Sequence, residues 1–86
     1  MAKWSRSVLN DVNKIFDYIA QDNEEAARQV AKNIYDASKE LDSHQQMGRK
    51  GTVSGTRELI MPKWPYIIIY RDQKNSGTQI LRVLHA

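Results

Sequence analysis

The 86-residue sequence predicts one domain of the α+β class, in which an N-terminal helical hairpin packs on a small antiparallel β-sheet. Apolar residues recur at helical spacing through the first half of the chain. β-branched and aromatic residues dominate short segments of the second half, as is typical of strands. Cysteine is absent, which excludes a disulfide scaffold and a thiolate metal site and favours a reducing, cytoplasmic environment.

The first helix is expected to begin after Ser5 or Ser7, because either hydroxyl can accept a hydrogen bond from the first turn. A short strand over residues 2–5 is predicted to precede it. The apolar stripe of this helix, at spacings of four and three residues, comprises Val8, Val12, Ile15 and Ile19. Such a stripe marks the side of a helix that faces a core.

A second helix is expected after residues 21–23, where the apolar stripe is interrupted. Asp22 is its predicted N-cap, and Glu24 and Glu25 follow in the first turn, where the helix dipole favours anions. The predicted buried face comprises Ala27, Val30, Ala31, Ile34, Ala37, Ser38 and Leu41. Two helices joined by so few residues form an antiparallel hairpin.

The composition changes between Ser43 and Gly55, a segment that holds three of the four glycines and has no periodicity. A long loop is predicted there, and such loops are commonly functional. Two interpretations remain open for Gly48–Gly51 within it. Its amide groups and two cations could cradle a phosphate, or the segment could be a plain flexible loop.

Three strands are predicted after this loop, over Thr56–Met61, Tyr66–Asp72 and Thr78–His85. A turn at Lys74–Gly77 would join the last two. Consecutive strands with short links favour an antiparallel meander. The whole chain, residues 1–86, is thus predicted to form a single domain.

Both faces of the predicted sheet carry apolar residues. The middle strand alternates Tyr66, Ile68 and Tyr70 with Ile67 and Ile69. Strict alternation in the last strand would place Ile80, Arg82 and Leu84 on one face. The other face would then carry Gln79, Leu81, Val83 and His85. Two helices cover only one face. Either the sheet curls on itself or a partner covers the second face, and an exposed apolar patch favours a protein partner.

Charge is distributed unevenly along the chain. Residues 1–42 carry a net charge of −2, whereas residues 43–86 carry +5. A basic half beside an acidic half indicates an acidic or polyanionic partner for the second half. No apolar run approaches the 18 or so residues that a membrane span needs, so we expect no membrane association.

A group of basic side chains could meet at one end or face of the sheet. Its members are Arg49, Lys50, Arg57, Arg71, Arg82 and His85. Arginine and histidine together can bind phosphates and move protons near neutral pH, which is what metal-free RNA cleavage requires. The only two histidines, His44 and His85, have no metal-ligand spacing, so no metal site is expected.

Five segments, in order, resemble the RelE/ParE superfamily of toxins from type II toxin–antitoxin modules, and the resemblance is closer to the ParE branch. They are Asp17-Tyr18-Ile19-Ala20, Gly48-Arg49-Lys50-Gly51, Gly55-Thr56-Arg57-Glu58-Leu59, Pro65-Tyr66-Ile67-Ile68-Ile69-Tyr70-Arg71 and Ile80-Leu81-Arg82-Val83-Leu84-His85. The resemblance implies a helical hairpin on a small antiparallel sheet. It also implies a cytoplasmic toxin without a cofactor, neutralised by a cognate antitoxin whose acidic C-terminal segment folds onto it.

The resemblance leaves two activities open. ParE-type toxins poison DNA gyrase, which is the favoured expectation. RelE-type toxins cleave mRNA on the ribosome without a metal, and in that alternative the catalytic residues would be Arg57, Arg82 and His85. The residues expected to bind the target or the antitoxin are Arg49, Lys50, Arg71, Tyr66, Ile68 and Tyr70.

Overall fold

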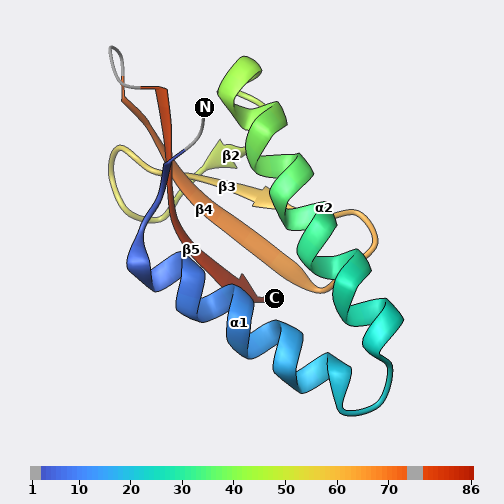
Figure 1. Ribbon diagram of the computed structural model, residues 1–86. Helices are drawn as coiled ribbons and strands as arrows, with labels where there is room; N and C mark the ends of the chain where they lie inside the picture. Colours follow the sequence, from blue (N-terminus) through green and yellow to red (C-terminus); the bar gives the residue numbers. More distant parts are fainter. Residues whose placement is uncertain (1–2, 74–76) are drawn as a thin grey trace.

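In the computed structural model, which describes residues 3–73 and 77–86, two helices pack on one face of a five-stranded sheet (Figure 1). The elements are β1 (Lys3–Trp4), α1 (Arg6–Ala20), α2 (Glu24–Ser43), β2 (Arg49–Lys50), β3 (Arg57–Ile60), β4 (Tyr66–Gln73) and β5 (Gly77–His85). The strand order is β1-β5-β4-β3-β2. The α+β prediction is therefore confirmed. The sheet is mixed rather than wholly antiparallel, because β1 pairs with β5 in parallel.

The N-cap of α1 is Ser5, which is one of the two caps that the sequence predicts. The Ser5 hydroxyl oxygen accepts a hydrogen bond from the Val8 amide at 3.2 Å. The same hydroxyl donates to the carbonyl of Leu81 in β5, also at 3.2 Å. Ser5 therefore joins α1 to the sheet, and it also satisfies one of the otherwise unpaired amides in the first turn of the helix.

The cap of α2 is Asn23, so the prediction of Asp22 is wrong. The amides of both Asp22 and Asn23 bond to the carbonyl of Ile19, which keeps Asp22 within the turn that closes α1. Asn23 has an extended backbone, and its side-chain oxygen accepts from the Ala26 amide at 3.1 Å. The predicted buried face of α2 is confirmed at Ala27, Val30, Ile34, Ser38 and Leu41, whereas Ala31 and Ala37 are half-buried.

The core lies between this helical layer and one face of the sheet. It includes Val8, Val30, Ile34, Leu41, Met61, Tyr66, Ile68, Tyr70, Ile80 and Val83. Both helices therefore contribute apolar side chains that meet β4 and β5. None of the described helices is long and apolar enough to cross a membrane.

A β-bulge in β5 makes the predicted alternation of that strand wrong. Ile69 of β4 pairs with Arg82, but the next residue, Tyr70, pairs with Ile80. Leu81 is the extra residue, so the side-chain period of two is broken there. As a result Ile80 and Val83, three residues apart, both point into the core.

The segment predicted as a long loop is held against the sheet by Tyr70. The Tyr70 hydroxyl accepts from the Gly48 amide and donates to the Gln45 carbonyl, each at 2.8 Å. A Cβ on Gly48 would lie 2.7 Å from that hydroxyl oxygen, so only glycine fits. The segment also contains β2, which pairs with β3. The turn predicted at Lys74–Gly77 lies largely outside the described residues.

Replacing Tyr70 by Phe should release this loop without emptying the core. We expect the free energy of unfolding to fall by about 1–2 kcal/mol, because the Gly48 amide and the Gln45 carbonyl lose their buried partner. Amide exchange at Gly48 should become faster, as measured by NMR. Tyr18→Phe is the matched control, since the Tyr18 side chain is 74% exposed. Unchanged exchange at Gly48 in Tyr70→Phe would contradict this account.

Candidate functional site

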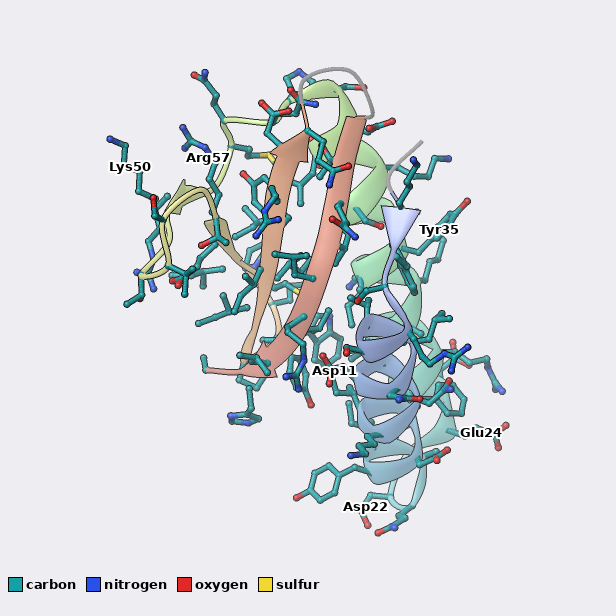
Figure 2. All side chains as sticks on the ribbon, turned by 90° about the vertical axis from the view of Figure 1, so that its left-hand side faces the viewer. Asp11, Asp22, Glu24, Tyr35, Lys50 and Arg57 are labelled. Atoms are coloured by element: carbon teal, nitrogen blue, oxygen red, sulfur yellow. The ribbon has the colours of Figure 1, made fainter. Side chains whose placement is uncertain are left out.

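The face of the sheet turned away from the helices is the candidate site, and we call it the open face. Cross-strand pairing places on it Lys3, Arg49, Glu58, Ile60, Ile67, Ile69, Arg71, Gln79, Arg82 and Leu84. In Figure 2, β4 and β5 lie in front of α2, and α1 lies beside β5. The helical layer therefore leaves this face without cover.

An apolar row crosses one end of the open face. Ile60 of β3, Ile67 of β4 and Leu84 of β5 are direct cross-strand partners. Ile60 is 52% exposed and Leu84 is 37% exposed, while Ile67 is half-buried. Single exposed apolar residues are ordinary, but a contiguous row on three adjacent strands is typical of an interaction surface.

In the middle of the open face, beside Ile69, Arg49 forms an ion pair with Glu58 at 3.0 Å. The end of this face beyond that pair is basic. Arg71 is exposed, and Lys3 of β1 pairs with Gln79 in the neighbouring strand. The face thus changes from apolar to cationic along the strands, which suits a partner that is both apolar and acidic.

Arg82 is bound by Asp11 of α1 rather than free. The Arg82 guanidinium donates two hydrogen bonds to the Asp11 carboxylate, at 2.7 and 2.9 Å. The Val83 amide donates a third at 2.9 Å. Figure 2 shows Asp11 on the side of α1 that faces β5. Asp11 thereby caps the outer edge of β5, where exposed amides could otherwise pair with another chain.

These bonds hold the pKa of the Asp11 carboxyl below its usual value of 3.8. The hydrogen bond from Arg82 is the main cause, and the Val83 amide adds to it, while burial acts in the opposite direction. The same contact raises the pKa of Arg82. At neutral pH both groups are therefore charged, and Arg82 is already paired when a ligand arrives.

The three residues predicted to be catalytic in RNA cleavage are not brought together. Arg57 pairs with Tyr70 and so lies on the helix-covered face, whereas Arg82 pairs with Ile69 on the open face. His85 pairs with Tyr66, four residues along β4 from Tyr70. At about 3.3 Å per residue this is roughly 13 Å along the strand.

His85 lies in an edge-to-face contact with the ring of Tyr66, at 5.5 Å between ring centres. Burial raises the pKa of the Tyr66 hydroxyl above its usual value of 10.0. That phenol therefore stays protonated near neutral pH and supplies no base beside His85. His85 itself is exposed at the end of β5.

The prediction that Tyr66, Ile68 and Tyr70 bind a partner needs correction. All three are buried, because this alternate set of β4 faces the helices. The other set, Ile67 and Ile69, lies on the open face instead. Arg49, Lys50 and Arg71 are exposed, so a binding role for them remains a prediction.

The sequence reasoning missed Ile60 and named Leu84 only as part of a strand pattern. A signal for Ile60 was available. It stands two residues after Glu58 in a predicted strand, so it shares a face with a charged residue, which is unusual for a core position. Its alignment with Ile67 and Leu84 depends on the strand register, which only the fold provides.

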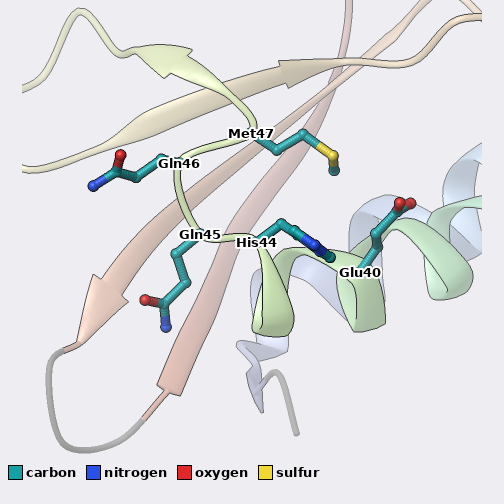
Figure 3. Close-up of a pocket in the computed structure, with 5 residues that line it drawn as sticks. All are labelled: Glu40, His44, Gln45, Gln46 and Met47. Carbon is teal, nitrogen blue, oxygen red and sulfur yellow. The ribbon is translucent and has the colours of Figure 1, made fainter.

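A hollow of about 480 Å³ lies at the C-terminal end of α2, lined by Glu40, His44, Gln45, Gln46 and Met47 (Figure 3). Glu40 and His44 lie one helical turn apart, and no third acidic or histidine side chain joins them there. Among the described residues there is no group of three or more His, Cys, Asp or Glu that could hold a metal ion.

Comparison with known proteins gives concordant results. The family model described as the ParE toxin of the type II toxin–antitoxin system parDE matches residues 2–86. A curated protein of Sinorhizobium fredii (strain NBRC 101917 / NGR234), named "Putative toxin Y4kP", is 36% identical over 84 residues, which are 98% of this chain and 85% of that protein. A solved structure titled "Chromosomal ParDE TA system from P. aeruginosa" is similar at a TM-score of 0.85 and 31% identity, over 99% of this chain and 94% of that one.

Asp11→Asn should test how far the contact with Arg82 and Val83 stabilises the sheet edge. We expect the free energy of unfolding to fall by about 1 kcal/mol at neutral pH, because a charged acceptor of three hydrogen bonds is lost from a partly solvated site. The measurement is thermal unfolding followed by circular dichroism. Asp17→Asn, an exposed position on the same helix, is the control and should change little.

The difference between wild type and Asp11→Asn should depend on pH. Because the folded-state pKa of Asp11 lies below 3.8, its stabilisation is fully present above that value and is lost as pH falls through the folded-state pKa. The two unfolding midpoints should therefore be well separated at pH 7 and converge in strong acid. A separation that grows on acidification would contradict this assignment.

Proposed function

Since this chain belongs to the ParE toxin family of type II toxin–antitoxin systems, we propose that a cognate antitoxin inactivates it by covering the open face, and that the free toxin inhibits DNA gyrase. The exposed apolar row of Ile60, Ile67 and Leu84 is the observation that carries the first part. Nothing in the described part of the chain covers that row.

The chemistry of the open face specifies the kind of antitoxin segment that fits. Its apolar row favours a segment with one apolar side, and its basic end favours acidic residues on the same segment. A disordered acidic segment that folds on binding could supply both while covering a large surface. Antitoxin binding should also stabilise the toxin by mass action, because the unfolded chain has no such surface.

Inhibition by binding suits the site better than RNA cleavage does. A metal-free nuclease needs its phosphate-binding and proton-transfer groups within reach of one scissile bond. Here Arg57 and Arg82 lie on opposite faces, and His85 lies at the far end of the sheet from Arg57. A target such as gyrase needs only a docking surface, which the exposed cations and apolar residues of the sheet can provide.

Ile60→Ser should weaken the complex with the antitoxin about tenfold, because it removes the most exposed member of the apolar row. The affinity can be measured by isothermal titration calorimetry with the purified antitoxin. Leu9→Ser on α1 is a matched control, since Leu9 is 50% exposed and Ile60 is 52% exposed. Equal losses for the two variants would argue against the open face as the interface.

Expression of the free toxin should trap double-strand DNA breaks and induce a DNA-damage response while translation continues at first. In a purified reaction, the toxin should inhibit the supercoiling of relaxed plasmid by gyrase. Toxin saturated with antitoxin is the control and should have no effect. Immediate translation arrest, with mRNA cut at defined codon positions and with cutting lost in Arg82→Ala, would instead establish the nuclease alternative.

A further inference from the structure

Two cations face each other where β2 meets β3. Lys50 and Arg57 are direct cross-strand partners in this two-residue pairing. Side chains in such positions have Cβ atoms about 5 Å apart, and like charges placed there destabilise the pair. Both residues also line one hollow of about 330 Å³, formed with the loop that joins the two strands. The hollow therefore concentrates positive charge at the edge of the sheet.

The surroundings of this hollow fix one of the two cations. The Arg57 guanidinium donates to the Gly48 carbonyl at 2.8 Å, which holds it in place. Lys50 is exposed, and Figure 2 shows it extending outward beside Arg57. A fixed donor beside a movable ammonium group is suited to capturing an oxygen acceptor, because little order has to be created on binding.

The connecting loop that lines the hollow is closed by backbone hydrogen bonds. The Gly51 amide donates to the Thr56 carbonyl at 2.8 Å, and the Thr56 amide donates to the Val53 carbonyl at 3.1 Å. These bonds hold the wall of the hollow beside the two cations.

We propose that this hollow binds a single carboxylate, an Asp or Glu side chain of the antitoxin, between Lys50 and Arg57. The inference rests on the proposed function, because the antitoxin that covers the open face supplies the carboxylate by continuing round the β2 edge to the opposite side, where Lys50 and Arg57 lie. Asp72 also lines the hollow, so its three charged groups sum to +1 and match one carboxylate. When the complex forms, the carboxylate relieves the repulsion between the two cations. The relief of that repulsion then adds to the affinity of the toxin for the antitoxin.

A peptide carboxylate fits this hollow better than a nucleic-acid phosphate does. Val53, which is 65% exposed, lies in the lining, and an apolar rim suits the side chains that flank a carboxylate in a peptide. A nucleic-acid strand carries a charge at every phosphate, and its further phosphates would approach Asp72 rather than another unpaired cation of the hollow.

Lys50→Gln tests the proposal in two measurements. In the free toxin at low salt, the substitution should raise the midpoint of thermal unfolding by about 1–4 °C, because it removes the repulsion with Arg57. In titration with the purified antitoxin, the same variant should bind about tenfold more weakly, with a smaller dependence on salt than wild type. Lys32→Gln, an exposed position on α2, is the control and should change neither quantity.

The outcomes distinguish failure of the carboxylate site from failure of the proposed function. If wild type binds the antitoxin and Lys50→Gln binds equally well, the carboxylate site is refuted while the proposed function stands. A lower unfolding midpoint for Lys50→Gln also refutes it. If the variant keeps its affinity for the antitoxin but loses affinity for a single-stranded oligonucleotide, the hollow binds phosphate instead. If wild type does not bind the antitoxin at all, the proposed function itself fails.

Discussion

Two helices can cover only one face of the sheet, and the function proposed for this toxin follows from that constraint. The helical layer packs against Ile68, Tyr70, Ile80 and Val83, which are buried. The opposite face keeps an apolar row. A partner that covers this row would gain roughly 25 cal/mol of binding free energy for each Å² of apolar surface removed from water. In the proposed function, the antitoxin buries this row whenever both proteins are present.

Side-chain contacts far apart in sequence hold the charged groups around this face in fixed positions. Asp11 binds Arg82 and the Val83 amide, so α1 sits against the edge of β5. Tyr70 fixes the loop before β2 through Gly48. Arg57 in turn donates to Gly48. Arg57 and Arg82 are therefore placed before any partner arrives, which lowers the entropy cost of binding.

The sequence was sufficient to predict the helices, the last three strands and the fold class, because periodicity and residue type are local signals. It could not decide which face of β4 is covered, since Tyr66, Ile68 and Tyr70 are as apolar as their neighbours Ile67 and Ile69. The bulge at Leu81 depends on pairing with β4, and β2 is too short to leave a pattern. The sequence therefore predicts a basic and apolar sheet surface as the candidate site. It assigns the buried residues of β4 to that surface, because it does not show which face the helices cover.

Methyl NMR of the toxin can show whether the antitoxin covers the open face. Isoleucine δ1-methyl signals can be compared between the free toxin and the complex with its antitoxin. We expect the largest shifts at Ile60, Ile67 and Ile69, with small shifts at the core residues Ile34 and Ile68. Unchanged signals for Ile60, Ile67 and Ile69 in a fully formed complex would contradict coverage of the open face.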